Sequence, residues 1–301
     1  MARKILLPDL DTCDQLLESV ETSTSADEQA RFIEQLVAAH QTVSMSLGRG
    51  SVFWRARRCG PGGFNEESSL SYPPAPLAKP GRLNNNGESV LYLSTRRETA
   101  LAEVGAVAGD LIHLGGFRVK RDSSVRVASV GEWHVVHKLG KMRFGPPEGA
   151  RAITRIMNKA GFEVGRSLIY VDAILGDILA SQSAHDTEYL STRLLINALY
   201  KKLPEIDGIA YPSVKDVGLN LAIRAQAADR AIEGCASLML EVQKVRRHGI
   251  YDYRTVKAAR GVATDGSFDW APSCQPNEMI IYRFHPGEDA SSIPFAHAID
   301  A

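Results

Sequence analysis

A glutamate that follows a short strand pattern is placed where a carboxylate could act on a ligand. Val90–Ser94 is typical of a short buried strand, and Thr95 with Glu98 has the spacing of a capping box that opens a helix. On that helix, Glu103 lies three residues after Ala100 and shares a face with small side chains. Because the strand leads directly into the helix, the first turn lies at the strand's end, where sites form. We therefore expect Glu103 to point into a cleft.

Several common catalytic and metal-binding patterns are absent from the sequence. It contains no P-loop, no G-x-G-x-x-G, no H-E-x-x-H and no G-x-S-x-G. His134 and His137 have the spacing of a metal pair, but no acidic or cysteine partner stands at ligand spacing, so no metal is expected. The cysteines form no C-x-x-C pair, and we expect reduced thiols at Cys13, Cys59, Cys235 and Cys274.

Composition excludes other classes of protein. The 301 residues include 35 basic and 35 acidic side chains, and this zero net charge gives no global reason to expect nucleic-acid or membrane binding. The most apolar stretch, Leu168–Ala180, contains two aspartates and is too short to span a bilayer. Pro8 and Asp9 interrupt any signal-peptide pattern. We expect a soluble, cytoplasmic protein.

The remaining elements follow from periodicity and turn residues. The first fifty residues are predicted to be helical, with a capping box at Ser25 and Glu28, and Ser44–Ser51 is predicted to be a linker. Further helices are predicted at about Glu148–Lys159 and Thr187–Leu203. Further strands are predicted at Leu111–Val119, Val125–Ala128, Ile209–Val214, Leu238–Val242 and Met279–Phe284.

A long irregular stretch, Cys59–Ser89, separates the first strand pattern from the second. It is rich in Gly, Pro, Asn and Ser, and it contains the run Gly81-Arg82-Leu83-Asn84. Stretches of this length without secondary structure are uncommon in a compact domain and are commonly binding loops or lids. We expect this segment to contribute to a binding site.

Four short motifs, taken in order, resemble one known family. They are Phe53-Trp54-Arg55, Gly81-Arg82-Leu83-Asn84, Leu91-Tyr92-Leu93 with Thr99-Ala100-Leu101-Ala102-Glu103, and Gly208-Ile209-Ala210-Tyr211-Pro212-Ser213. Together they resemble the RES domain, which is named for its arginine, glutamate and serine and supplies the toxin of bacterial Xre–RES toxin–antitoxin pairs. The resemblance implies an α+β fold similar to ADP-ribosyltransferases, with a split mixed β-sheet around a NAD cleft and, here, a helical N-terminal extension.

The resemblance also implies an activity, in which NAD is consumed by hydrolysis or phosphorolysis of its nicotinamide–ribose bond. Cleavage of that bond passes through an oxocarbenium-like transition state, and nicotinamide leaves as a neutral molecule, so its departure needs no general acid. The enzyme needs a carboxylate that stabilises positive charge on the ribose and a clamp for the diphosphate. The residue types of the four motifs fit both requirements.

Individual roles follow by matching this chain to the family motifs. Glu103 would be the carboxylate, and Arg82, Tyr92 and Ser213 complete the predicted catalytic set. Arginine matches a diphosphate through its bidentate fork, Tyr92 offers a flat face to nicotinamide or ribose, and Ser213 offers a hydroxyl. The predicted NAD-binding residues are Arg55, Arg82, Asn84, Tyr92, Ser213 and Asn220.

Two matches leave alternatives open. The first family arginine corresponds to Arg55, Arg57 or Arg58. The family loop commonly has an aromatic residue where this chain has Leu83, which leaves open how the ligand is held there.

The predicted organisation has three parts. Residues 1–50 form a helical extension, residues 51–245 the catalytic domain and residues 246–301 a C-terminal extension. The extensions could contact an antitoxin, form a homodimer, bind a protein substrate or block the cleft. The expected partners are NAD and an Xre-type antitoxin, with no membrane and no direct nucleic-acid contact.

Alternative functions come from other classes. A mono-ADP-ribosyltransferase differs only in the nucleophile, which would be a protein side chain. A non-catalytic binding module would keep the cleft and use the extensions for partners. A toxin that acts on nucleic acid would need a basic surface or clustered His and Lys groups, and neither is visible in the sequence.

Overall fold

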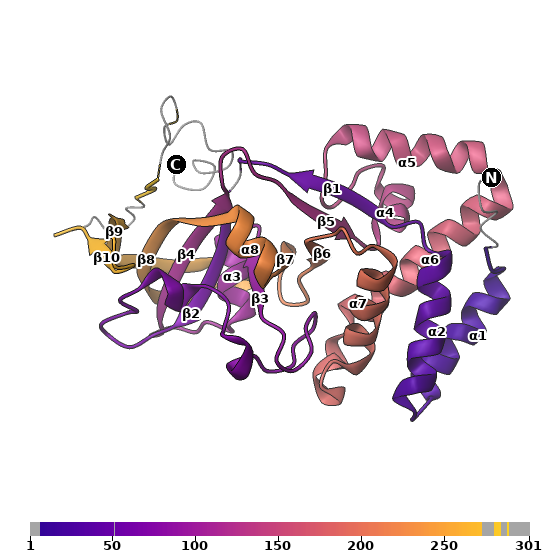
Figure 1. Ribbon diagram of the computed structural model, residues 1–301, viewed down its shortest axis with the longest axis horizontal. Helices are drawn as coiled ribbons and strands as arrows, with labels where there is room; N and C mark the ends of the chain where they lie inside the picture. Colours follow the sequence, from indigo (N-terminus) through magenta and orange to yellow (C-terminus); the bar gives the residue numbers. More distant parts are fainter. Residues whose placement is uncertain (1–6, 51, 273–279, 284–287, 289–301) are drawn as a thin grey trace. The chain divides into compact units, whose positions relative to one another are not determined.

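The computed structural model describes residues 7–50, 52–272, 280–283 and 288 (Figure 1). The chain divides into two compact units, each built from segments that are far apart in the sequence. Unit 1 comprises residues 1–45, 78–88 and 126–211, and unit 2 comprises residues 46–77, 89–125 and 212–301.

Unit 1 is mainly helical. Its helices are α1 (Leu10–Thr22), α2 (Ala26–Ala39), α4 (Glu132–Leu139), α5 (Pro147–Ala160), α6 (Phe162–Ala180) and α7 (Leu190–Lys202), with a 3₁₀ turn η3 at Gln182–Thr187. The predicted start of α2 is confirmed, because the Ser25 hydroxyl accepts the backbone N–H of Glu28. Helix α6 packs against α1, α2, α4, α5 and α7, which explains why its sequence is apolar on most sides.

A buried polar cluster fixes helix α6 within unit 1. Nε2 of His40 lies 2.7 Å from Oδ1 of Asp172, and both side chains are fully buried. The other ring nitrogen of His40 lies 2.8 Å from the hydroxyl of Thr42. Asp172 also accepts the backbone N–H groups of Gly131, at 2.9 Å, and His134, at 3.0 Å, at the start of α4. The aspartate in the apolar stretch is therefore a satisfied structural group.

Three strands accompany these helices, in the order β1-β5-β6. They are β1 (Val43–Leu47), β5 (Val125–Ser129) and β6 (Gly208–Pro212), and β5 runs parallel to β6. The predicted strands at β5 and β6 are confirmed. The linker predicted at Ser44–Ser51 is wrong in its first part, because β1 runs through it and Ser44 accepts a hydrogen bond from the side chain of Arg126.

Unit 2 contains an antiparallel sheet with the order β7-β3-β2-β4-β8-β9-β10. Its strands are β2 (Phe53–Arg58), β3 (Val90–Ser94), β4 (Leu111–Val119), β7 (Leu219–Arg224), β8 (Ile232–Val245), β9 (Tyr251–Val262) and β10 (Phe268–Trp270). Two short helices, α3 (Arg97–Glu103) and α8 (Ala225–Ala231), pack on it, and 3₁₀ turns η1 (Glu67–Leu70), η2 (Ala75–Leu77) and η4 (Arg247–Gly249) lie in its loops.

One prediction for unit 2 is wrong, and two of its strands were not predicted. The strand predicted at Met279–Phe284 is not formed: Ile281 makes only an isolated bridge to Ala236, and Met279 and Phe284 lie outside the described residues. Strands β9 and β10 form the C-terminal edge of the sheet instead, and the sequence analysis missed both.

The sheet of unit 2 is split between β2 and β3, as predicted. Strand β2 pairs along its whole length with β4, and β3 pairs along its whole length with β7. Strands β2 and β3, by contrast, register only at Trp54 and Ser94. The backbone hydrogen bonds of β2 are therefore made mainly to β4, and those of β3 mainly to β7. The two halves of the sheet are joined only at Trp54 and Ser94 and can diverge from that point.

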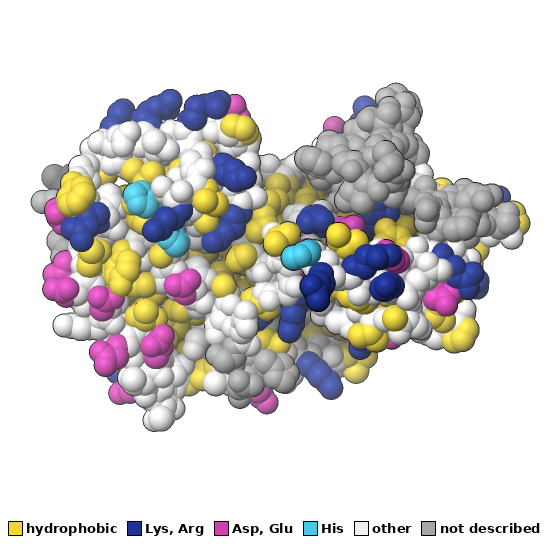
Figure 2. All heavy atoms as spheres, turned by 180° about the vertical axis from the view of Figure 1, so that it is seen from behind, with side chains coloured by type: hydrophobic (Ala, Val, Ile, Leu, Met, Phe, Trp, Pro, Cys, Tyr) yellow, Lys and Arg dark blue, Asp and Glu magenta, His cyan; other side chains and the backbone are white. Residues whose placement is uncertain are grey.

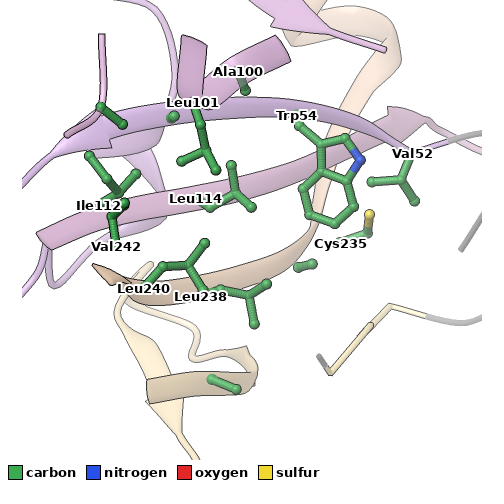
Figure 3. Close-up of a cluster of buried hydrophobic side chains, with 14 of the residues drawn as sticks. Val52, Trp54, Ala100, Leu101, Ile112, Leu114, Cys235, Leu238, Leu240 and Val242 are labelled. Carbon is green, nitrogen blue, oxygen red and sulfur yellow. The ribbon is translucent and has the colours of Figure 1, made fainter. Parts of the chain in front are cut away.

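The main core of unit 2 lies on the sheet face covered by α3 (Figure 3). Trp54, Leu114 and Leu238 project from neighbouring strands onto Leu101 of the helix. Helix α3 begins at Arg97 and not at Thr95, because the Thr95 hydroxyl bonds the backbone of β7 at Leu219 and does not cap the helix. This packing places Glu103, the last residue of α3, at the edge of the core.

His113 on β4 is buried on the opposite face of the sheet. Its Nδ1 accepts the N–H of Phe64 at 3.0 Å, so Nε2 carries the proton and donates to Ser237 at 2.7 Å. The rings of Phe64, Phe268 and Trp270 surround it. Burial, with a smaller effect of nearby positive charges, lowers the pKa of His113 to about 4.

This histidine predicts a specific loss of stability in acid. In the unfolded chain His113 becomes protonated below about pH 6.5, whereas in the folded chain it stays neutral until the pH reaches its folded-state pKa of about 4. Between these two values the unfolded state binds more protons than the folded state, so the free energy of unfolding decreases as the pH falls. The expected contribution is about 3 kcal/mol. Urea unfolding at pH 7, 5.5 and 4 should show this slope in the wild type and lose it in His113→Gln. Parallel curves for the two proteins would contradict the assignment.

Candidate active site

Glu103 is held by two side chains from outside its own helix. Its Oε1 accepts hydrogen bonds from the hydroxyl of Ser213, at 2.7 Å, and from the amide of Asn220, at 2.6 Å. Its Oε2 accepts no hydrogen bond from the described residues, and the side chain is exposed. One carboxylate oxygen is thus fixed while the other faces outward, where it can meet a developing positive charge.

The orientation of Asn220 is set across the two strands that precede the site. Ser94 on β3 stands opposite Asn220 on β7, and its hydroxyl donates to Oδ1 of Asn220 at 2.7 Å. Both side chains are buried. Because the amide oxygen is occupied by Ser94, the amide nitrogen is directed at Glu103.

Ser213 begins a tight turn between β6 and β7. Its hydroxyl accepts the backbone N–H groups of Lys215, at 3.0 Å, and Asp216, at 3.1 Å, while its own N–H donates to the carbonyl of Gly218. Asp216 accepts the hydroxyl of Thr99 and thereby ties the turn to α3. A Cβ at Gly218 would lie 2.0 Å from Oγ1 of Thr99, so only glycine fits there.

Arg55 is the least exposed of the three possible matches to the first family arginine. Its guanidinium donates to the carbonyl of Tyr92 at 3.2 Å, and its Nε is buried without a partner. Burial, together with the positive charge of Arg57, lowers the pKa of Arg55 to about 10. Arg58, by contrast, is exposed and pairs with Asp110. A buried cation without a carboxylate partner is suited to an anionic ligand.

Arg55 lines a large pocket of about 1340 Å³ that lies wholly in unit 2. Glu103, Ser213 and Asn220 do not line it. Alternate residues of a strand point to opposite faces of a sheet, and Arg55 is offset by one residue from Trp54, which faces α3. The carboxylate and the arginine therefore lie on opposite faces of the unit 2 sheet, at the place where it splits.

Arg82 and Asn84 belong to unit 1, whereas the other predicted site residues belong to unit 2. Arg82 donates to the carbonyls of Leu179, at 2.7 Å, and Ser181, at 2.9 Å, at the end of α6. The amide nitrogen of Asn84 donates to the carbonyls of Lys79 and Asn85 and closes its own turn. The ligand-binding roles assigned to Arg82 and Asn84 stay predictions.

The sequence analysis missed three residues that support the site: Ser94, Thr99 as a hydroxyl donor, and Asp216. Thr99 is named there only as the first residue of the Thr99–Glu103 motif. A pairing of β3 with β7 would have identified Ser94, because it ends its strand directly opposite Asn220.

A basic helix face in unit 1 is separate from these residues. Figure 2 shows a row of Lys and Arg side chains where α5 lies. Arg151, Arg155 and Lys159 line a shallow pocket of about 410 Å³ there.

Within the described ranges, no group of three His, Cys, Asp or Glu side chains could hold a metal ion, and no helix is long and apolar enough to cross a membrane. The expectation that the protein binds no metal stays a prediction.

Comparison with known families identifies the family to which this α+β chain belongs. The family model of the RES domain matches residues 52–241, which include Arg55, Glu103, Ser213 and Asn220. The chain therefore belongs to the RES domain family.

Among solved structures, the chain is similar to a chain in the crystal structure of the M. tuberculosis MbcT–MbcA toxin–antitoxin complex. The sequence identity is 14% and the TM-score 0.34, and the match covers 69% of this chain and 91% of that chain. No curated protein sequence matches this chain.

Proposed function

We propose that this protein is a NAD-cleaving toxin, which breaks the nicotinamide–ribose bond by hydrolysis or phosphorolysis and is neutralised by an Xre-type antitoxin in the cytoplasm. The observation that carries the proposal is the Glu103 carboxylate, fixed through one oxygen and open at the other. Membership in the RES family supports it.

The chemistry assigns a role to each carboxylate oxygen. As the bond between nicotinamide nitrogen and ribose C1′ breaks, its electron pair leaves with neutral nicotinamide and positive charge develops on the ribose. Oε2 of Glu103 stabilises that charge. Water or phosphate then bonds to C1′, and the water proton passes to solvent. Removal of such an electrostatic partner costs on the order of a hundredfold or more in rate.

Ser213 and Asn220 keep the carboxylate in position through the reaction. Both donate to Oε1, and neither contacts Oε2, so the reactive oxygen does not have to give up a partner when substrate arrives. The buried Ser94–Asn220 hydrogen bond fixes this arrangement before binding.

We propose that Arg55 supplies the second requirement, a site for the diphosphate, and that NAD passes through the split between β2 and β3 so that it reaches Glu103 on one face and Arg55 on the other. Its buried guanidinium contacts only a backbone carbonyl of the described residues, so a phosphate group would be its first anionic partner. The carbonyl belongs to Tyr92, whose ring we assign to nicotinamide or the adjacent ribose.

Transfer of ADP-ribose to a protein is the second candidate function. The exposure of Glu103 favours it, because a protein side chain could reach C1′ as readily as water could. Incubation with labelled NAD and cell lysate separates the two, since only transfer leaves label on a protein.

The direct test is nicotinamide release by the purified full chain. Wild-type protein should release nicotinamide from NAD, and Glu103→Gln should be slower by on the order of a hundredfold, because the neutral amide cannot stabilise the ribose cation. Glu163→Gln, an exposed helical glutamate in unit 1, should be as fast as the wild type. No release by micromolar wild type, or full release by Glu103→Gln, would refute the role of Glu103.

A growth assay tests the toxin part of the proposal. Expression of wild type in a bacterial host should arrest growth and deplete cellular NAD, whereas Glu103→Gln at equal protein level should do neither. Coexpression of an Xre-type antitoxin from the adjacent gene should restore growth. Arrest by Glu103→Gln equal to that by wild type would separate toxicity from NAD cleavage.

A further inference from the structure

The large pocket of unit 2 has a wall that lies outside the RES match. The match ends at residue 241, yet Asp265, Gly266 and Arg283 line the pocket together with Arg55. Asp265 and Gly266 belong to the turn between β9 and β10, which Figure 1 shows at the edge of the unit 2 sheet. The described part of the chain after residue 245 therefore contributes to this pocket.

Backbone hydrogen bonds join the β9–β10 turn to the loop from Cys59 to Leu77, which also lines the pocket. The N–H of Glu67 donates to the carbonyl of Gly266 at 3.1 Å, and the N–H of Phe268 donates to the carbonyl of Asn65 at 2.9 Å. Glu66 and Ser267 form a β-bridge between these two bonds. The loop is thus held as a short added strand.

Arg283 adds a side-chain clamp to the same point. Its two terminal nitrogens donate to the two carboxylate oxygens of Glu67, each at 2.9 Å, and one of them also donates to the carbonyl of Gly234 at 2.8 Å. A Cβ at Gly234 would lie 2.1 Å from Oε1 of Glu67, so the glycine makes room for the pair. Arg283 itself has a φ of 63°, a conformation that non-glycine residues adopt only when their surroundings impose it.

The far end of the loop is fixed at the other side of the pocket. The hydroxyl of Tyr72 donates to Asp229 on α8, and the hydroxyl of Ser89 donates to the carbonyl of Pro73. The part of the loop that lines the pocket is therefore held at Glu67 by Arg283 and at Tyr72 by Asp229.

The charges of the pocket favour an anionic ligand. Arg55, Arg57 and Lys120 each bond to backbone carbonyls and have no carboxylate partner among the described residues. Of the carboxylates of the lining, Glu67 and Glu233 pair with arginines, whereas Glu66, Asp229 and Asp265 are exposed and accept hydrogen bonds from hydroxyl groups. The partly buried side chains of the lining that lack an oppositely charged partner among the described residues are Arg55 and Lys120, and both are positive.

We propose that the β9–β10 turn and Arg283 complete this pocket, and that Arg283 is a positioning residue that clamps the Cys59–Leu77 loop through Glu67 so that the pocket can bind the phosphate-bearing part of the substrate. The choice of ADP-ribose as that part rests on the proposed function. The clamp itself rests on the contacts of Arg283, Glu67 and the β9–β10 turn.

The test is ADP-ribose binding to the full chain by titration calorimetry. Arg283→Gln and Glu67→Gln should each weaken binding about tenfold or more, because either change releases the loop, and Arg283→Lys should lie between them and the wild type. Arg246→Gln is the matched control: it breaks an exposed bidentate pair with Asp252 in the same extension, away from the pocket, and should bind as the wild type does.

A second readout separates clamping from general damage. Hydrogen exchange of residues 64–72 should quicken in Arg283→Gln and stay unchanged in Arg246→Gln, with thermal unfolding confirming that both are folded. If Arg283→Gln does not fold, Arg283→Lys decides the question. Wild-type affinity and exchange in the clamp variants, or no ADP-ribose binding by wild type, would overturn the inference. ADP-ribose binding without nicotinamide release would refute the proposed function alone.

Discussion

The buried amide of Asn220 links the two strands β3 and β7 to the one carboxylate that the site presents. Its oxygen accepts from Ser94 and its nitrogen donates to Glu103, so each end of the amide is committed. An amide buried at this position without both partners would leave a polar group unsatisfied, at a cost of roughly 1–3 kcal/mol. The strand register that places Ser94 opposite Asn220 therefore also determines where Glu103 lies. The turn at Ser213 adds a second donor, and this turn is itself tied to α3 through Asp216 and Thr99.

The placement of charge explains how a neutral chain can bind an anion. Most cations of unit 2 near the sheet are neutralised locally: Arg49 and Arg118 lie against Glu233 and Glu288, and Arg283 lies against Glu67. Arg55, Arg57 and Lys120 differ from these, since each bonds only to backbone carbonyls among the described residues. The zero net charge of the sequence thus coexists with an uncompensated positive charge in one pocket, which suits a small phosphate-bearing molecule better than a long polyanion.

The sequence predicted the parts of the site that depend on local motifs. Glu103, Ser213 and Asn220 are predicted from the sequence as site residues, and in the structure Ser213 and Asn220 each donate a hydrogen bond to Glu103. The capping box at Thr95 failed because a strand that is distant in sequence, β7, takes its hydroxyl, and no local pattern reveals such competition. The edge strands β9 and β10 were missed for a different reason: they follow β8 through short turns, but β9 is mostly half-buried and lacks the strict alternation of apolar and polar residues that indicates a strand. The family motif grouped Arg82 with residues that belong to a different unit of the chain, because a motif gives chain order and no positions in space.

The central claim is that Asn220 acts on the reaction only through the carboxylate of Glu103. A double-mutant cycle measures this directly, with nicotinamide release by wild type, Asn220→Ala, Glu103→Gln and the double variant. The account predicts that Asn220→Ala alone slows release about tenfold and that the double variant is no slower than Glu103→Gln alone, since the carboxylate that Asn220 positions is already gone. Losses that multiply in the double variant would contradict the account, because they would show that Asn220 and Glu103 act independently.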